Sequence, residues 1–332
     1  MKNIAFISIS RVVAMLSIVL CHIIKYYTFI PGSEFLGQFF NVGVQMFIII
    51  SGYLYGIKFL NGGGKFEKPG VFLWKRLIKV SLPVQLFALM LLAYYGLDEI
   101  WHTLIVLLNL QGIGFIINTE LFGTGSKMGH TWFITVILIC YLLTPILHKW
   151  NQQGRITPKR LTLMWIIALI LPYLGIYLGN IALYVTSFYV SANRELKRYN
   201  ITVLLLICFL AIAIRVIGRI LFDETILYKN IICLLTHIIL AISIMLIIRE
   251  LTYKFSSVLS VVEKKLYQFL EKHSFYIYIT HYCLIPSIYN QFGLLIATCY
   301  FSISTLVLSV ALRLVHKITE RGIKGLAVNK SV

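Results

Sequence analysis

Charged side chains are scarce in this sequence: Asp, Glu, Lys and Arg together make up only 13% of its 332 residues. Hydrophobic residues make up 59%, and the mean hydropathy is +0.86. A single water-soluble core cannot hide that much apolar surface, so a soluble globular domain is excluded. The composition predicts an integral membrane protein whose apolar segments have the bilayer as their solvent.

Acidic residues are the scarcer charged type, with 12 Asp and Glu against 30 Lys and Arg. None of them falls in the middle of a confidently expected span, whereas proton-driven transporters commonly relay protons through buried carboxylates. Transport driven in that way is therefore disfavoured. A net charge of +18 would suggest nucleic acid in a soluble protein, but here the basic residues lie in short connections between apolar runs. They are a topology signal, and we expect no nucleic-acid partner.

Several familiar motifs are missing. The six cysteines all fall within apolar stretches, with no CxxC pair and no His/Cys metal spacing, so we interpret them as small core residues and expect no metal site. P-loop, Rossmann glycine, HExxH and GxSxG patterns do not occur either. ATPase, dehydrogenase, zincin and α/β-hydrolase functions therefore have no support in the sequence.

Ten apolar runs meet or approach the roughly 20 residues that a transmembrane helix needs. They predict an all-α integral membrane protein with about ten transmembrane helices in a single bundle, forming one domain over residues 1–332. The first run is too long for a signal-peptide core, so we treat it as a retained helix. The two short runs between 161 and 193 have a single tilted span as their alternative. The expected spans are 4–28, 39–60, 77–96, 130–148, 161–178, 180–193, 201–222, 231–249, 273–290 and 293–316.

Basic clusters predict the orientation, because short cytoplasmic connections carry an excess of Lys and Arg. If residues 100–117 crossed the membrane, the cluster from Lys149 to Arg160 would be exported. We therefore expect 100–117 not to span, and its polar and glycine residues suit a re-entrant or interfacial piece. Both termini are then cytoplasmic.

Two ionisable residues lie on one face of the first expected span. Arg11 and His22 are 11 residues apart, which is close to three helical turns and about 16.5 Å along the axis. A charge within a membrane helix is costly, so such residues are functional candidates. The alternative is that Arg11 snorkels towards the cytoplasm and His22 is a satisfied residue of the bundle.

Further polar residues lie at or near the expected depth of His22. Asn41 and Gln45 share a face of the second span, His130 opens the fourth span, and His281 lies near the middle of the ninth. The alternative for His130 is a polar residue at the membrane interface beside a belt tryptophan.

Arg76 and Lys79 lead into the third span and are three residues apart, which places them on one face of a helix. They suit a cationic mouth for a phosphate-rich cytosolic ligand. The alternative is that they determine topology only.

These residues occur in an order that resembles a known family. The elements are Arg11 with His22, Met46 to Tyr53 with Ser51-Gly52, Arg76 with Lys79, His130 to Phe133 followed by Tyr141 and Pro145, and Tyr278 to His281. Together they resemble the membrane-bound acyltransferase 3 family of bacteria, in the subgroup of surface-polysaccharide O-acetyltransferases, from about residue 4 to about residue 316. Lys79 departs from the family pattern, which has a second Arg there, so the charge is kept and the planar fork is lost.

The resemblance implies transfer of an acyl group, usually acetyl from cytosolic acetyl-CoA, to a sugar hydroxyl of a cell-envelope glycan or its lipid-linked precursor. It implies a multi-pass protein of the bacterial cytoplasmic membrane with no permanently bound cofactor, whose partners are acetyl-CoA, the glycan acceptor and membrane lipids. A transient acyl-histidine is the alternative to a general base, and a non-catalytic exporter or flippase of glycan or lipid is the alternative function. The expected site residues are His22 as the base with Arg11, then Arg76, Lys79 and Arg11 for the CoA phosphates, and His130, Asn41, Gln45 and His281 for the acceptor.

Overall fold

The computed structural model describes residues 2–26, 32–63, 66–96, 100–120, 125–193, 196–223, 225–255, 263–285, 288 and 294–329. Within these ranges the chain is built from helices joined by turns and short connections, with no β-strand. An all-α architecture is therefore confirmed for the described part of the chain.

The elements follow one another closely along the chain. The α-helices are α1 (Lys2–Tyr26), α2 (Ser33–Phe40), α3 (Val42–Asn61), α4 (Pro69–Arg76), α5 (Leu82–Tyr95), α6 (Ile100–Leu107), α7 (Ile113–Ile116), α8 (Gly125–Met128), α9 (Trp132–Gln152), α10 (Pro158–Ile170), α11 (Gly179–Asn193), α12 (Ile201–Phe222), α13 (Cys233–Lys254), α14 (Glu263–Thr280) and α16 (Leu294–Asn329). Two π-helical turns, η1 (Leu77–Ser81) and η5 (Leu227–Ile232), and three 3₁₀ turns, η3 (Gly129–Thr131), η4 (Leu171–Leu174) and η7 (Tyr282–Leu284), join or extend them.

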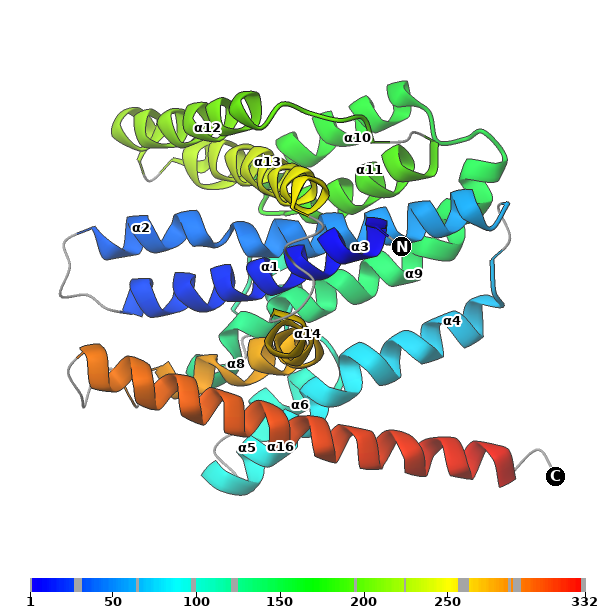
Figure 1. Ribbon diagram of the computed structural model, residues 1–332, viewed down its shortest axis with the longest axis vertical. Helices are drawn as coiled ribbons and strands as arrows, with labels where there is room; N and C mark the ends of the chain where they lie inside the picture. The colour runs from blue at the N-terminus through cyan, green and yellow to red at the C-terminus, as the bar shows by residue number, and fades with distance from the viewer. Residues whose placement is uncertain are drawn as a thin grey trace.

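The helices form a bundle with α1 near its centre (Figure 1). The helices α10 to α13 lie on one side of α1, and α5, α14 and α16 lie on the other. The helix α14 is seen nearly end-on while α1, α3 and α16 run across the view, so α14 crosses them steeply. Because α1 contacts α2, α3, α13 and α14, its side chains can reach both halves of the bundle.

Seven helical segments are long and apolar enough to cross a membrane, by length and composition, within the described residues. They overlap seven of the expected spans, which confirms a polytopic membrane protein, while the full count of ten stays a prediction. The segments are Phe6–Tyr26, Ser33–Asn61, Pro69–Tyr95, Gly129–Gln152, Ile201–Phe222, Leu227–Lys254 and Ile296–Lys324.

The remaining expected spans correspond to shorter elements. The 161–193 region forms α10 with 13 residues and α11 with 15, separated by η4 and by Gly175 in the left-handed conformation. At 1.5 Å per residue, these helices are about 20 Å and 22 Å long, short of a hydrocarbon core of roughly 30 Å. The expected span 273–290 begins within α14, but its positions 286–287 and 289–290 lie outside the described residues, as do 27–28 of the first span and 293 of the last.

The stretch 100–117 consists of α6 with 8 residues, a turn, and α7 with 4. Its turn contains Asn109 at φ 57 and is held by the protein: the Ser81 hydroxyl donates to Asn109 Oδ1 at 2.5 Å, and the Thr135 hydroxyl donates to the Asn109 carbonyl at 2.8 Å. Irregular backbone at membrane depth is tolerated where protein groups satisfy it in this way. The helix α6 is about 12 Å long, which suits a non-spanning piece, although its depth in the membrane stays a prediction.

A close approach between α1 and α3 fixes the centre of the bundle. A Cβ on Gly43 would lie 2.2 Å from the carbonyl oxygen of Ala14, so only glycine fits there. One turn away, the Ser17 hydroxyl donates to the carbonyl of Phe40 at 2.7 Å, where Asn41 separates α2 from α3. The helix that carries Arg11 and His22 is thereby held firmly against α3.

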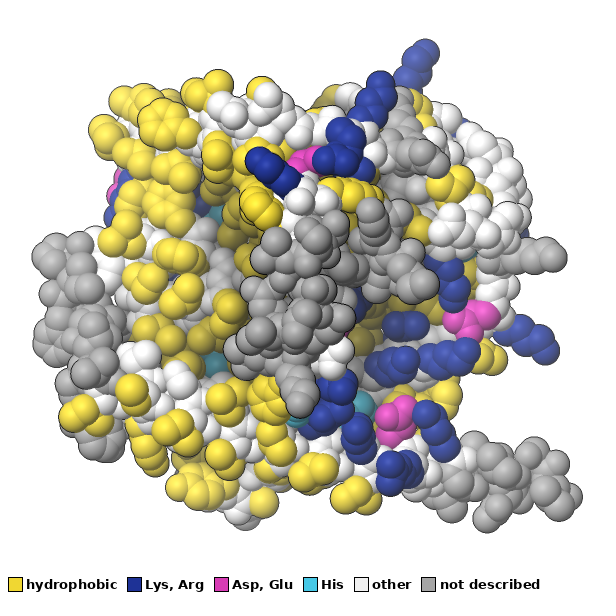
Figure 2. All heavy atoms as spheres, viewed as in Figure 1, with side chains coloured by type: hydrophobic (Ala, Val, Ile, Leu, Met, Phe, Trp, Pro, Cys, Tyr) yellow, Lys and Arg dark blue, Asp and Glu magenta, His cyan; other side chains and the backbone are white. Residues whose placement is uncertain are grey.

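Basic side chains gather at one end of the bundle. In Figure 2 most of the visible Lys and Arg side chains lie on the side where Figure 1 places the α3–α4 connection and the last turns of α16. We call this the inner end and the opposite one the outer end. On α1, Arg11 is nearer the inner end and His22 nearer the outer end.

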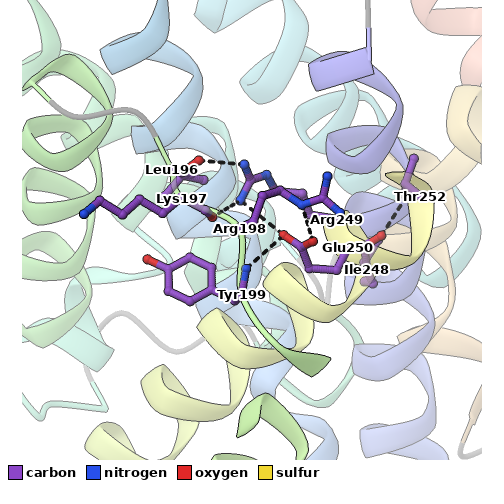
Figure 3. Close-up of polar contacts among 8 residues, drawn as sticks. All are labelled: Leu196, Lys197, Arg198, Tyr199, Ile248, Arg249, Glu250 and Thr252. Carbon is purple, nitrogen blue, oxygen red and sulfur yellow. Dashed lines mark hydrogen bonds and ion pairs between the residues drawn. The ribbon is translucent and has the colours of Figure 1, made fainter. Parts of the chain in front are cut away.

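Part of this basic population forms a structural clamp on the connection between α11 and α12 (Figure 3). Arg249 of α13 donates to the carbonyls of Leu196 and Lys197 at 2.7 and 2.8 Å. Glu250 accepts from Arg198 at 2.6 Å and lies 3.6 Å from Arg249. Arg249 and Glu250 are both buried, so these charges pair with one another and with backbone instead of facing a ligand.

Candidate active site

Three histidines that are far apart in the sequence meet beside α1. His22 of α1, His130 of η3 and His281, which follows α14, have ring centroids 6.3 Å (His22–His130), 5.3 Å (His22–His281) and 4.9 Å (His130–His281) apart. The ring of Tyr282 lies against this group, 4.8 Å from His22 and 4.9 Å from His130. We call His22, His130, His281 and Tyr282 the histidine cluster.

Backbone carbonyls orient two of these imidazoles. The Nδ1 of His281 lies 2.8 Å from the carbonyl oxygen of Tyr278, and the Nε2 of His130 lies 3.2 Å from that of Ile279. Because a carbonyl only accepts, these nitrogens carry the protons, and in a neutral ring the other nitrogen keeps its lone pair. Those other nitrogens, Nε2 of His281 and Nδ1 of His130, are buried without a hydrogen-bond partner. The cluster can therefore accept hydrogen bonds or a proton from a molecule that enters it.

His22 differs from its neighbours in exposure: it is partly exposed, whereas His130 is 3% and His281 0% exposed. Its closest ring neighbours are His281 and Tyr282. Asn41 and Gln45, which the sequence predicted at the depth of His22, belong to a second group of polar residues.

Asn41 and Gln45 instead line a polar cavity of about 420 Å³ at the outer end, which Arg215 and His237 also line. We call it the polar cavity. Lys25, three residues beyond His22, and Trp132, two residues beyond His130, line it as well, so it adjoins the histidine cluster. The two predicted groups of polar residues thus occupy neighbouring sites.

The inner end of α1 lies near a second group. The guanidinium of Arg76 lies over three aromatic rings, 5.5 Å from Tyr55, 5.3 Å from Phe72 and 5.9 Å from Tyr141. Arg11 is close enough for its charge to act on the hydroxyls of both tyrosines. Arg11 and Arg76 therefore concentrate positive charge around one aromatic pocket, which we call the cationic pocket.

Lys79 does not join the cationic pocket. It is exposed, and the acidic group that its charge reaches is Glu320 of α16. The reason is η1, because a π-helical turn holds more residues than an α-helical one and residues three apart no longer share a face. The Ile78 carbonyl in this turn lies 2.9 Å from Nε2 of His316, which donates to it.

Aromatic side chains lie between the cationic pocket and the histidine cluster. Phe47 of α3 and Phe133 of α9 have centroids 6.0 Å apart, and Tyr278 of α14 lies 6.4 and 6.0 Å from them. Tyr278 also contacts His130, at 5.2 Å between rings, and its hydroxyl donates to the His130 carbonyl at 2.6 Å. Aromatic contacts thus continue inward from the cluster along α3 and α9.

Two residues of the polar cavity, Arg215 and His237, were not predicted from the sequence. Arg215 lies in the expected span 201–222 and His237 in 231–249, and both are buried. The signal that could have found them is the one that singled out Arg11 and His22, an ionisable residue in the middle of an apolar run.

Among the described residues, no group of three or more His, Cys, Asp or Glu is arranged to hold a metal ion.

Fold and site together define a polytopic membrane protein with a histidine cluster at one end of a central helix and a cationic pocket at the other. A family model described as an acyltransferase domain, that of the acyltransferase 3 family, matches residues 4–314, nearly the whole chain. The chain therefore belongs to the acyltransferase 3 family and is a membrane acyltransferase. No curated protein and no solved structure matches the chain.

Proposed function

We propose that the protein transfers an acetyl group from cytosolic acetyl-CoA to a hydroxyl of a cell-envelope polysaccharide or its lipid-linked precursor, with His22 as the general base. One observation carries this proposal: α1 holds His22 within the histidine cluster, and Arg11, further inward on the same helix, acts on the hydroxyl of Tyr55, whose ring also contacts Arg76. A donor with a phosphate-rich end and a reactive end suits a site of that form.

The histidine cluster can carry out the chemistry of acyl transfer. The acceptor hydroxyl loses its proton to His22 as its oxygen attacks the thioester carbonyl, the carbon–sulfur bond breaks, and the CoA thiolate takes up the proton. The lone pairs on His130 and His281 would hold the acceptor hydroxyl or the N–H of His22. A transient acyl-imidazole on His22 is the alternative route, with the same atoms and charges in its overall balance.

The cationic pocket suits the other end of the donor. Guanidinium groups pair with phosphate oxygens through paired N–H donors, which an ammonium cannot reproduce. Arg76 is held over its aromatic rings, and its Nε is buried without a hydrogen-bond partner. We assign Arg76 and Arg11 to binding the phosphates of CoA. The exposed Lys79 has no part in this binding.

The test is acetyl transfer by purified protein in nanodiscs with labelled acetyl-CoA and an envelope glycan fraction, following CoA release and label on the glycan. His22→Ala should lower the rate by about 10²–10⁴-fold, the usual contribution of a general base, without changing yield or elution profile. His130→Ala and His281→Ala should lower it less. His102→Ala, which removes a histidine of α6 outside the cluster, is the control.

A His22→Ala rate within a few-fold of wild type removes His22 from the mechanism. Label that stays on the protein after rapid denaturation at neutral pH, and is lost in His22→Ala, supports the acyl-histidine route. The exporter alternative predicts glycan movement without any CoA release, so a wild-type protein that releases no CoA contradicts the proposed function as a whole.

A further inference from the structure

We propose that the polar cavity binds an anionic group of the acceptor, a phosphate or a carboxylate, and that Arg215 is the residue that recognises it. This inference rests on the proposed function for the identity of the acceptor. The binding itself is a property of the cavity and can be measured without any transfer reaction.

Arg215 is the starting point because it is 1% exposed in the middle of α12. An arginine at the centre of a membrane helix is costly, because its charge is taken out of water. Most side chains of α12 are exposed to the surroundings, yet Arg215 is buried. The free-energy cost of burying this guanidinium must be offset by a group that pairs with its charge.

The contacts of Arg215 within the described residues are neutral. Its Nη1 lies 2.5 Å from Nε2 of His237, its Nη2 donates to Oε1 of Gln38 at 3.3 Å, and the ring of Phe39 lies 5.0 Å from its guanidinium carbon. The Nε of Arg215 is buried without a hydrogen-bond partner. A buried cation that meets only neutral groups keeps most of its desolvation cost.

The guanidinium of Arg215 itself lacks acceptors of full strength. The Nε2 of His237 lies 2.8 Å from the carbonyl oxygen of Gln38 as well as beside Arg215. One ring nitrogen can donate to the carbonyl or accept from the guanidinium, but it cannot do both. An incoming oxyanion would supply the acceptors that Arg215 lacks.

The charges around the cavity favour an anion. Lys25, Arg219 and Lys229 line it together with Arg215. The acidic side chains that line it are Glu34 and Asp223, which are exposed, and Asp223 lies 3.7 Å from Arg219. Arg215 is thus the buried cation, and its charge is not balanced by either carboxylate.

The position of the cavity explains why its ligand would be the acceptor. Lys25 lies one turn beyond His22 on α1, about 4.5 Å further along the axis, and the cavity volume of about 420 Å³ is in the range of small-molecule sites. An acceptor anchored there by its anionic group would present a hydroxyl to the neighbouring histidine cluster. The anionic group would be the phosphate of a lipid-linked sugar or the carboxylate of an acidic sugar.

The experiment measures binding to the protein in phosphatidylcholine nanodiscs, from the shift of the thermal unfolding midpoint with inorganic pyrophosphate, glucuronate and glucose. We expect a shift with one or both anions and none with glucose. Arg215→Gln should weaken the apparent affinity at least tenfold. Arg219→Gln should keep most of it, because that guanidinium is already paired with Asp223. Arg76→Gln should keep the Arg215-dependent part, which separates this cavity from the cationic pocket.

Gln38→Glu is a second test that does not depend on the folding of Arg215→Gln. It would place a carboxylate in contact with Arg215, so it should raise the midpoint without ligand and abolish the anion-induced shift. A shift with pyrophosphate alone points to a lipid-linked phosphate, and one with glucuronate alone to an acidic sugar. The proposal is overturned if neither anion shifts the midpoint, if Gln38→Glu keeps the full shift, or if Arg215 matters only in nanodiscs that contain phosphatidylglycerol, which would indicate a lipid headgroup.

Discussion

Arg76 differs from the other cations of its segment in what surrounds its guanidinium. The rings of Tyr55, Phe72 and Tyr141 enclose it, and a desolvated cation–π contact contributes on the order of 2 kcal/mol. Lys79, three residues on, is exposed. The two basic residues of one motif therefore have different environments and should have different roles.

This difference gives a kinetic prediction. Arg76→Gln should raise the KM for acetyl-CoA about tenfold or more, since a charge-assisted hydrogen bond contributes about 1.5–3 kcal/mol. Lys79→Gln should change it by less than about twofold, because an exposed charge is screened. Steady-state kinetics at varied donor concentration, at low and high salt, measures both. Equal effects of the two substitutions on KM would show that Lys79 also binds the donor.

The site could be predicted from the sequence only in part, and single residues show why. His22, His130 and His281 stand out because each is a polar residue in or beside an apolar run. That they would meet depends on how η3 and the end of α14 approach α1, which follows from tertiary packing. The exposed position of Lys79 depends on a π-helical turn, for which the sequence has no clear signal.

At the scale of elements, α3 packs closely against α11 as well as against α1. A Cβ on Gly52 would lie 2.5 Å from the carbonyl of Tyr184, and one on Gly56 would lie 1.9 Å from the Ser191 hydroxyl. Small residues let membrane helices approach in this way. The Ser51-Gly52 pair that resembles the family motif is therefore also a packing contact.

Gly56→Ala tests this contact. The added methyl group has no room, so we expect destabilisation of about 1–3 kcal/mol, seen as a lower thermal midpoint in detergent. Gly70→Ala in α4 is the control, because nothing lies within 4 Å of its added Cβ. Equal midpoints for the two variants would show that α3 and α11 are not in close contact.

The clamp in Figure 3 joins two other elements by charge. Glu250 is 4% exposed and contacts both Arg198 and Arg249, so Glu250→Gln would leave the buried Arg249 without its carboxylate. We expect a midpoint several degrees lower and faster proteolysis between α11 and α12. Glu320→Gln is the control, because its pair with Lys324 is exposed on the lysine side and contributes little. Unchanged stability in Glu250→Gln would indicate that Arg249 holds the connection through the carbonyls alone.

Elements were predictable where composition decides them. The long apolar runs became helices near their expected bounds, because the backbone of a membrane segment satisfies its hydrogen bonds internally. The 161–193 region was harder, since a proline, two glycines and an asparagine interrupt a run of ordinary hydropathy. Which side chains face the centre also depends on neighbours, as the burial of Arg215 on the largely uncovered α12 shows.

For the whole molecule, the distribution of basic residues predicts the orientation. Basic side chains gather at the inner end in Figure 2, and short cytoplasmic loops carry such an excess. In a background without the six cysteines, Glu120→Cys should react with an impermeant maleimide from outside the cell. Lys68→Cys should react only after the membrane is opened, since both positions are exposed and the predicted topology places them on opposite sides of the membrane. The reverse pattern would invert the bundle and place the histidine cluster in the cytoplasmic half.

The uninterrupted course of α1 has a consequence for the choice of donor. Because Arg11 and His22 lie on one helix, backbone geometry fixes the distance between them at about 16.5 Å along the axis. This distance sets the minimum length of a donor that contacts both residues. A donor whose phosphates bind near Arg11 must be long enough for its thioester to reach His22. Acyl carriers without a long arm, such as acetyl phosphate, would reach one end or the other but never both. The protein would therefore select its donor by length as well as by charge.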